Sequence, residues 1–306
     1  MLTPGQDLAG YLVTRLGQLC LFLVTGTSVL AVLLIFYFII QQAWPFLAEH
    51  NILEIFTHSG WYPEREQAEF GVLPLIVGSL YVTTCAMLIA GPLGLITACF
   101  LSDIVAFRIR QVIKPVIELL AAIPSVAYGF FAVMVFAPFL QHEAGLRTGT
   151  NILNVSIILA IMALPTIISV AEDALMAVGR DMREASYALG ATRSETIVRT
   201  AMPAAHNGIL AGIVLGVMRA IGETMLVWMA SGNAAQIPHP WWDIAQSVRT
   251  ITATIAVEMG ETEKGSDHFH MLFVLGLLLL LFTFVLNLIT EFFLKRVKKQ
   301  AGGMRL

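Results

Sequence analysis

Six apolar runs, each long enough to cross a lipid bilayer, constrain this chain more than any other feature. The chain is 57% hydrophobic and 13% charged, whereas soluble domains average roughly 25% charged residues. Because a helix of about 20 apolar residues spans the hydrocarbon core, we predict an all-α integral membrane protein with six transmembrane helices. The predicted spans cover residues 19–40, 73–101, 116–140, 152–171, 208–230 and 271–294.

Prolines interrupt three of these runs. Pro92 lies between Gly91 and Gly94 in the second run, and we expect a kink or a break there, since proline removes a helical hydrogen bond. The third run contains Pro124 and the fourth contains Pro165. Both can be accommodated within spans, because neighbouring membrane helices satisfy the freed backbone groups.

Basic residues distinguish the two sides of the membrane. One side holds few of them, at Arg65, Arg147, Arg249 and Lys264. The other side holds many: Arg15, Arg108, Arg110, Lys114, Arg180, Arg183, Arg193, Arg199, Lys295, Arg296, Lys298, Lys299 and Arg305. Since cytoplasmic loops are enriched in lysine and arginine, we expect both termini in the cytoplasm.

This topology divides the chain into three parts. Residues 1–70 are expected to form a cytoplasmic tail, the first membrane helix and an external loop. Residues 71–294 form the transmembrane domain, which includes a cytoplasmic loop at about 172–207. The basic residues in 295–306 form a cytoplasmic tail that contacts lipid headgroups.

The external loops differ in character. Residues 41–72 are acidic, and residues 231–270 form a long loop with paired tryptophans, Trp241 and Trp242, which suit the membrane interface. Within that loop, residues 247–261 fit either an amphipathic, partly re-entrant helix or an ordinary loop.

Few residues have the chemistry of a metal or redox centre. His268 and His270, with Asp267, lack a third well-spaced ligand. We expect no metal, no cofactor bound by this chain and no nucleic-acid partner. The cysteines lie inside apolar runs, where we expect them to pack as small side chains: Cys20, Cys85 and Cys99.

The cytoplasmic loop carries its own helical signals, as a structureless loop of this length is uncommon. Residues 184–189 favour a helix, and Gly190 offers the left-handed turn that ends one. Thr192, followed three residues later by Glu195, fits a capping box. Pro203 would end this second helix or begin the membrane helix. We therefore predict two short helices at an angle on the inner membrane face.

This loop resembles the EAA loop of ABC importer permeases, in which Glu-Ala-Ala precedes a later glycine and then Leu-Pro. Ser186 replaces the second alanine and Met202 replaces the leucine. The resemblance implies a type I ABC importer permease fold whose loop docks into a groove on an ATPase subunit, whereas the simpler alternative is a solvated loop. The residues implicated in coupling are Glu184, Ala185, Ser186, Gly190, Ala191, Thr192 and Pro203.

The ATPase is expected to be a separate subunit. A phosphate-cradling P-loop needs Gly-Lys followed by Ser or Thr, and no lysine in this chain follows a glycine. We therefore expect a transport subunit that is not itself an enzyme, with ATP and Mg used by the partner.

The fifth run combines a glycine ridge with buried charge. Gly208, Gly212 and Gly216 recur every four residues, which lets helices approach closely. At about 100° per residue, Arg219 and Glu223 fall on the same face as this ridge. Arginine at the bilayer centre costs about 2.5–3.5 kcal/mol on insertion scales, so it is normally partnered and functional.

Two interpretations of Arg219 stay open. Glu223, one helical turn away, is its natural partner in a structural ion pair. Alternatively the guanidinium serves as an anion path or gate, since its planar fork suits phosphate and carboxylate oxygens. Glu223 would then accept a proton from the anion or hold Arg219 until the anion arrives. Weaker candidates for hydroxyl donors are Thr224, Ser79 and Thr83.

The segment 219–225, Arg-Ala-Ile-Gly-Glu-Thr-Met, resembles the signature of phosphate-specific ABC importer permeases of the PstC type. Stretches from about residue 15 to 296 share the resemblance, including 70–74, 118–129 and 252–260. It implies phosphate uptake across a bacterial inner membrane. The implied partners are a homologous PstA-type permease, a PstB-type ATPase dimer and an external PstS-type phosphate-binding protein.

Three rival functions remain. The first is an ABC permease for another oxyanion, such as phosphonate, molybdate or sulfate. A second is an ion-coupled carrier that works alone, and a third is a membrane sensor or scaffold. Transport assays with and without an ATPase separate them.

Overall fold

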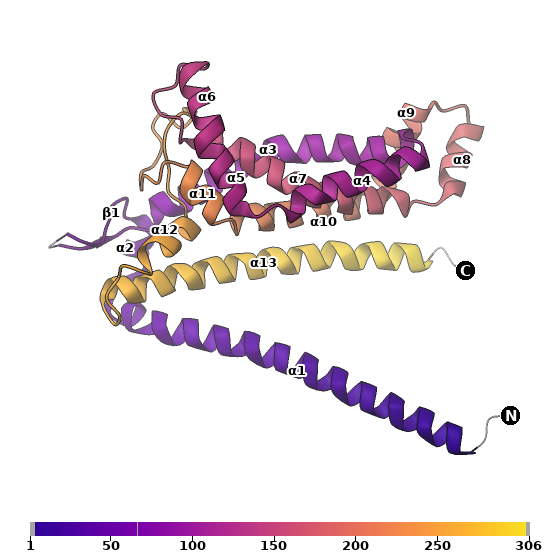
Figure 1. Ribbon diagram of the computed structural model, residues 1–306, viewed down its shortest axis with the longest axis horizontal. Coiled ribbons are helices and arrows are strands. Elements are labelled where there is room, and N and C mark those ends of the chain that lie inside the picture. Colours follow the sequence, from indigo (N-terminus) through magenta and orange to yellow (C-terminus); the bar gives the residue numbers. More distant parts are fainter. Residues whose placement is uncertain (1–3, 66, 304–306) are drawn as a thin grey trace.

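The computed structural model describes residues 4–65 and 67–303, and it is almost entirely helical (Figure 1). Within the described residues, six helical segments are long and apolar enough to cross a membrane. The predicted number of spans is therefore confirmed, with altered bounds for the third and fifth. The six segments are Thr14–Glu49, Leu73–Ile104, Ser125–His142, Ile152–Met176, Arg193–Ile221 and Asp267–Phe292.

Three helices form the centre of the molecule: α3 (Leu73–Cys99), α7 (Ile152–Met176) and α10 (Met202–Ile221). They lie side by side in Figure 1. A Cβ added at Gly208 would lie 2.4 Å from the Ala174 side chain, and one at Gly216 would lie 2.7 Å from Ile167. The glycine ridge therefore makes the predicted close helix contact, and its neighbour is α7 of the same chain.

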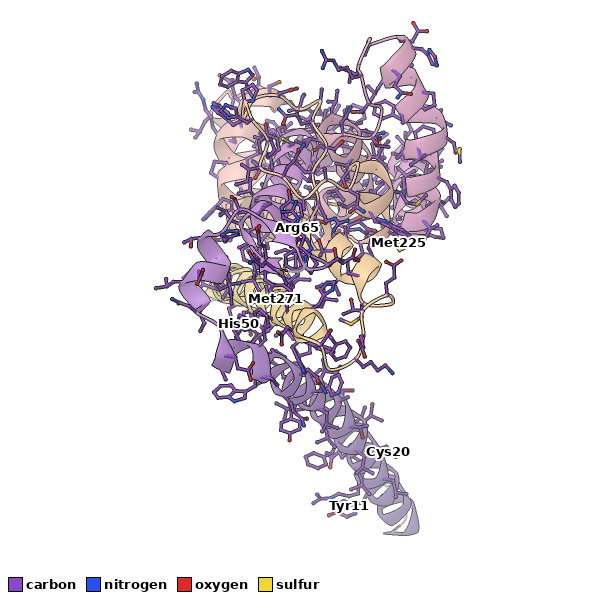
Figure 2. The ribbon with its side chains drawn as sticks, turned by 90° about the vertical axis from the view of Figure 1, so that its left-hand side faces the viewer. Tyr11, Cys20, His50, Arg65, Met225 and Met271 are labelled. Atoms are coloured by element: carbon purple, nitrogen blue, oxygen red, sulfur yellow. The ribbon has the colours of Figure 1, made fainter. Side chains whose placement is uncertain are left out.

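Helix α13 (Asp267–Gly303) lies between the central helices and α1 (Pro4–Glu49), as Figure 1 shows. Helices α1 and α13 pack together at one end, where Phe38 and Phe273 are 5.6 Å apart, and then diverge (Figure 1). Figure 2 shows Cys20 on the diverging part of α1. Cys20 is exposed and Cys85 and Cys99 are partly buried, so the expectation that all three cysteines pack inside the protein is wrong for Cys20.

Pro124 divides the predicted third span. The amphipathic helix α4 (Phe107–Ala122) ends before it, and α5 (Ser125–Phe131) follows. Ile123 has extended backbone angles, φ −66° and ψ 127°, as expected for a residue before proline. The prediction of one helix over residues 116–140 is wrong. The span instead comprises α5, a π-helical turn η2 (Ala132–Phe136) and α6 (Ala137–His142).

Pro92 does not break its helix. It lies inside α3, which continues to Cys99 and into a π-helical turn, η1 (Phe100–Ile104). Pro165 is likewise inside α7. The predicted break in the second span is therefore wrong, since α3 packs along α7 on both sides of Pro92 and this packing offsets the lost hydrogen bond.

The fifth span begins earlier and ends earlier than predicted. Helix α9 (Arg193–Thr196) continues through a π-helical turn, η3 (Ile197–Ala201), directly into α10. The second helix predicted for the loop at residues 172–207 is thus the start of the membrane helix, and the prediction of a separate short helix is wrong. After Ile221 the helix breaks, and α11 (Met225–Ala230) begins anew.

Short elements complete the chain. In the loop between α7 and α10, α8 (Arg180–Ala188) precedes the turn at Gly190. At the opposite end lie α2 (Ile52–Thr57) and α12 (Ile251–Glu258), so residues 247–261 include a helix. Strands β1 (Trp61–Tyr62) and β2 (Glu69–Phe70) pair antiparallel, with Trp61 opposite Phe70.

Candidate functional site

The candidate site lies where the fifth span breaks. Arg219 occupies the last turn of α10, whereas Glu223 and Thr224 lie between α10 and α11. In the part of the chain that the structure describes, no ion pair joins Arg219 to Glu223. The predicted partnership is wrong, because the helix ends before Glu223 and the one-turn spacing no longer brings the side chains together. The Glu223 carboxylate accepts a hydrogen bond from the Leu226 N–H, at a long 3.5 Å.

Arg219 points at the C-terminal end of α4. Its Nη2 donates a long hydrogen bond of 3.5 Å to the carbonyl oxygen of Ala121. Tyr128 donates a 2.8 Å hydrogen bond from its hydroxyl to the neighbouring carbonyl of Leu120. Both contacts lie where a helix has unpaired carbonyls and a partial negative charge. The structure thus places the arginine beside a weakly negative helix end, and among the described residues it forms no salt bridge.

The guanidinium is incompletely bonded. The Nε atom of Arg219 is buried and has no hydrogen-bond partner among the described residues. An unpartnered buried donor on a charged group is costly, and buried donors in folded proteins are almost always bonded. Arg219 therefore retains the capacity to bind an acceptor that arrives from outside the chain.

Of the predicted hydroxyl donors, Ser79 and Thr224 bond backbone groups. Ser79 accepts a 3.0 Å hydrogen bond from the backbone N–H of Ile251 and donates to the Leu75 carbonyl at 2.8 Å. Thr83 is buried on α3, and Thr224 donates to the Gly222 carbonyl at 3.4 Å. Ser79 therefore holds the start of α12, which is a structural role that its depth and polarity did not indicate.

Thr252 joins α12 to the break, and the sequence analysis did not identify it. Its hydroxyl donates a 2.8 Å hydrogen bond to the backbone carbonyl of Glu223. The start of α12 is therefore held by Ser79 on one side and by the interrupted backbone at Glu223 on the other. Residue type alone gives no signal for this contact, because threonine is common in apolar helices.

A cluster around Glu258 fixes the other end of α12. Its carboxylate accepts hydrogen bonds from Arg249 Nη1 at 2.5 Å and from Trp61 Nε1 at 3.0 Å, and it lies 2.8 Å from His268 Nε2. Arg249 Nε also donates to Asn233 Oδ1 at 2.8 Å. The side chains of Arg249, Glu258 and His268 are 17%, 12% and 14% exposed. This cluster joins the β1–β2 hairpin, α12 and α13.

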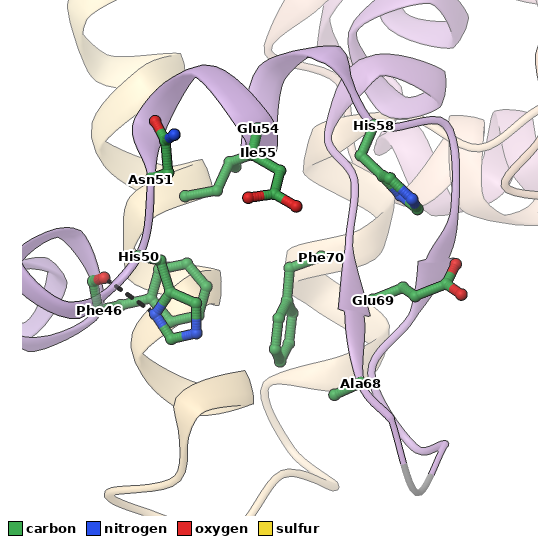
Figure 3. A pocket seen from close by; sticks show the side chains of 9 residues that line it. All are labelled: Phe46, His50, Asn51, Glu54, Ile55, His58, Ala68, Glu69 and Phe70. Atoms are coloured by element: carbon green, nitrogen blue, oxygen red, sulfur yellow. Dashed lines mark hydrogen bonds between the residues drawn. The ribbon is translucent and has the colours of Figure 1, made fainter.

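A pocket of about 200 Å³ lies between α2 and the hairpin (Figure 3). Phe46 and His50 stack in it with ring centroids 4.0 Å apart, and His50 Nδ1 lies 3.2 Å from the Phe46 carbonyl oxygen. Glu54 and Glu69 contribute carboxylates to the lining. Because carboxylates repel anions, this pocket is a poor extension of the Arg219 site.

The loop at residues 172–207 has the turn and the helix cap that its sequence predicts. Gly190 adopts the left-handed conformation, with φ +87°. Thr192 and Glu195 form the capping box, with the Thr192 N–H donating to Glu195 Oε2 at 2.9 Å. Ala191 donates its N–H to the Ser186 carbonyl at 3.2 Å, and Pro203 lies in the first turn of α10. These contacts fix α8 at an angle to the start of the fifth span.

Ser186 has a specific contact in this arrangement. Its hydroxyl lies 2.9 Å from that of Thr196 and accepts a 3.3 Å hydrogen bond from Thr200. Glu184 and Ala185 are exposed on α8. The departure from the Glu-Ala-Ala pattern therefore supplies a bond between α8 and the fifth span.

Another polar contact, between α4 and α7, lies near the loop that contains α8. Lys114 Nζ on α4 is 3.0 Å from Glu172 Oε2 and 2.9 Å from Asp173 Oδ1, both on α7. Desolvation lowers the pKa of Lys114, but hydrogen bonds to Asp173 and Glu172 outweigh it, so the net pKa is raised. The ion pair attaches α4, which has no buried residue of its own, to the central helices.

Comparison with known proteins agrees with this architecture. Residues 90–299 match the family described as "Binding-protein-dependent transport system inner membrane component". The chain belongs to this family. Family membership and the six apolar helices make it a multi-pass membrane protein and a transport subunit.

Curated relatives narrow the comparison. The chain is 40% identical over 246 residues to "Probable ABC transporter permease protein YqgH" of Bacillus subtilis, covering 80% of this chain and 79% of that protein. It is 35% identical over 266 residues to "Phosphate transport system permease protein PstC" of Mesorhizobium japonicum, covering 81% and 80%. The Pasteurella multocida PstC protein is 30% identical over 264 residues, covering 80% of each chain.

Solved structures support the fold alone. A bacterial ABC transporter for import of the acidic polysaccharide alginate aligns with a TM-score of 0.60 at 13% identity, covering 94% of this chain and 98% of that one. The inward-facing MetNI methionine ABC transporter aligns with a TM-score of 0.56 at 15% identity, covering 76% and 99%. The type I ABC importer permease fold predicted from the sequence is confirmed.

Proposed function

We propose that this chain is a PstC-type permease subunit of an ATP-driven importer of inorganic phosphate. The observation that carries the proposal is the guanidinium of Arg219, whose Nε is buried without a partner among the described residues at a break in a membrane helix. The relatives named as phosphate permeases support this choice of anion.

Arg219 would bind the anion by exchanging its present hydrogen-bond acceptor for a phosphate oxygen. Its present acceptor is a neutral carbonyl of Ala121 at 3.5 Å. A phosphate oxygen carries charge, and charge-assisted hydrogen bonds are shorter and roughly twice as strong as neutral ones. An arriving phosphate would therefore displace the α4 carbonyl and also satisfy Nε, so that substrate binding and release of the α4 end are coupled.

Glu223 and Thr224 would act next to the anion. Both lie in the non-helical break, where backbone and side chains can reorient without unwinding α10. The Glu223 carboxylate is available to accept a proton from a protonated phosphate. Thr224, and less directly Ser79 and Thr83, would line the path.

The partner ATPase would act on this chain through α8 during ATP hydrolysis. Leu189, at the end of this helix, is 90% exposed, and Tyr187 is 42% exposed. Apolar side chains exposed next to a charged helix suit a protein interface. Glu184–Ala185 and the turn at Gly190 would complete the surface that meets the ATPase.

The remaining subunits follow from this assignment. A PstB-type ATPase dimer would bind ATP and Mg, since no lysine of this chain follows a glycine as a P-loop requires. A PstA-type permease would complete the membrane pathway, and a PstS-type protein would deliver phosphate to the external loops. The complex would lie in a bacterial inner membrane with both termini of this chain in the cytoplasm, residues 71–294 forming the transmembrane domain.

Uptake by the reconstituted complex tests the proposal. Labelled phosphate should accumulate only with ATP and all partners present. Unlabelled phosphate should compete, and phosphonate, molybdate and sulfate should compete weakly. Uptake by the purified chain alone would instead identify an ion-coupled carrier. An Arg219→Ala variant with normal uptake and altered signalling would identify a sensor.

A further inference from the structure

Helix α8 is attached to the rest of the chain by very few side chains. None of its residues is buried. Two residues point back to the membrane helices: Ser186, through the hydroxyls of Thr196 and Thr200, and Arg183. Apart from the chain connections to α7 and α9, these contacts link α8 to the membrane helices, and the arginine makes the larger set.

Arg183 uses its whole guanidinium to bond two other helices. Its Nε donates to Asp103 Oδ1 at 2.8 Å, and Nη2 lies 3.5 Å from Asp103 Oδ2. The same Nη2 donates to the Leu175 carbonyl at 2.8 Å, and Nη1 donates to the Val178 carbonyl. Asp103 lies in the π-helical turn after α3, and Leu175 and Val178 lie at the end of α7. One side chain thus joins α8 to two of the three central helices, α3 and α7.

This contact is suited to transmit force. The side chain of Asp103 is 5% exposed and that of Arg183 is 15% exposed, so water screens the pair little. A guanidinium that bonds a carboxylate through two nitrogens has a fixed orientation. Helices α3 and α7 then pack closely, since a Cβ at Gly94 would lie 2.7 Å from Ile167. A shift of α8 would therefore move α3 and α7 together.

The central helices lead to the candidate site. Ser79 on α3 holds the start of α12, and α12 holds the Glu223 carbonyl through Thr252. Lys114 ties α4, whose far end meets Arg219, to α7. Both paths connect Arg183 to the break at the end of α10 through packed helices.

We propose that Arg183 is the positioning residue that transmits movement of α8 to α3 and α7 during transport. This inference rests on the proposed function, because α8 is the element on which the ATPase would act. Arg183 touches neither phosphate nor nucleotide. Its loss should separate ATP hydrolysis from phosphate movement and leave each partial reaction in place.

The test is the number of ATP molecules hydrolysed per phosphate imported by the reconstituted complex. Arg183→Met should raise this ratio about 5-fold or more, which is the lower range of energetic coupling between distant sites. Arg180→Met is the matched control, since Arg180 is exposed on the same helix, and its ratio should equal that of the wild type. The ratio is independent of how much complex folds, because both rates scale with the number of complexes.

If the Arg183→Met complex fails to assemble, a covalent cross-link that replaces the contact between Arg183 and Asp103 keeps the test decisive. Asp103→Cys with Arg183→Cys, in a background where Cys20, Cys85 and Cys99 are alanine, allows a short thiol cross-linker to join α8 to the end of α3. The ratio should be high before cross-linking and return toward the wild-type value afterwards. An unchanged ratio in Arg183→Met, or in the unlinked double variant, would overturn the inference.

The wild-type complex separates the two proposals. Absence of ATP-dependent phosphate uptake in the wild type contradicts the proposed function before any variant is compared. Normal wild-type uptake with an unaltered ratio in the Arg183 variants contradicts only the role of Arg183.

Discussion

The Glu258 cluster and the Arg219 site both withdraw charge from water, but they differ in how fully that charge is bonded. Glu258 accepts hydrogen bonds from Arg249 and Trp61 and pairs with His268. Arg219 has one contact of 3.5 Å with a carbonyl, and its buried Nε has no partner in the described chain. A saturated polar network fixes a structure, whereas an unsaturated charge keeps bonding capacity for a ligand.

Helix α12 connects the two regions. Its C-terminal end carries Glu258, and its N-terminal end carries Thr252, which bonds the Glu223 carbonyl beside Arg219. The saturated cluster therefore holds the rigid element against which the unsaturated site is positioned. Substitution of Glu258 should therefore change mainly the stability of the protein, whereas substitution of Arg219 should change mainly transport.

The largest expected effect is on stability. Glu258→Ala leaves Arg249, His268 and the Trp61 N–H without their shared acceptor, which should lower the free energy of unfolding by about 3 kcal/mol. This is the lower end for a broken buried pair, since the side chains retain 12–17% exposure. The midpoint of thermal unfolding in detergent measures it. The control is Glu261→Ala, at an exposed neighbouring position, which should change the thermal midpoint little. An equal fall in the thermal midpoint of both variants would contradict the stabilising role of the Glu258 cluster.

The second effect should appear in transport. Arg219→Met removes charge-assisted bonds to the anion worth about 1.5–3 kcal/mol, so phosphate uptake should fall roughly 10- to 100-fold. The thermal midpoint should change little, because the residue has one weak contact. Arg219→Lys keeps the charge and loses the fork, so it should recover part of the activity. Full uptake in Arg219→Met, with normal assembly, would contradict the anion site.

A smaller effect should follow from cutting the link between the regions. Thr252→Val preserves shape and removes the bond to the Glu223 carbonyl, which should cost about 1 kcal/mol and reduce uptake about fivefold. Thr254→Val is the control, because the Thr254 hydroxyl bonds only the Thr250 carbonyl within α12. Equal uptake by the two variants would show that α12 does not position the break through Thr252.

The smallest expected effect is on the pH dependence of stability, through the ion pairs of Lys114 with Glu172 and Asp173. The pKa of Lys114 is raised, since desolvation, which lowers it, is outweighed by the bonds to Asp173 and Glu172. The stabilisation is therefore complete below the ordinary pKa of lysine and is lost only as pH rises through the raised value. The difference in thermal midpoint between the wild type and Lys114→Met should be the same at about pH 6 and about pH 9. A difference that shrinks over this range would show that Lys114 titrates within it.

Features that depend on neighbouring residues were predictable from the sequence. The left-handed turn at Gly190 and the capping box of Thr192 and Glu195 are as expected, since each involves residues within a few positions of one another. The six spans follow from the length of apolar runs. Proline effects were predicted less well: Pro92 leaves α3 intact and Pro124 ends α4, because the outcome depends on what packs against each side.

The candidate site also combines features that the sequence predicted with features that depend on tertiary packing. Arg219 was identified from its depth in an apolar run, but its partner was assigned to Glu223 by helical spacing, and the break at Gly222 removes that spacing. Ser79 was selected for polarity and instead holds α12. Thr252, Glu258 and Arg183 gave no local signal, since their partners are distant in the chain.

The sequence by itself determined that this chain crosses the membrane six times and carries a helix–turn–helix loop, because apolar length and local backbone preferences act over short ranges. Only the tertiary structure decided which charges are saturated. Trp61 and Glu258 are 197 residues apart, and Arg183 and Asp103 are 80 apart. Helix packing brings such residues together, and removal from water then makes the presence or absence of each partner energetically significant.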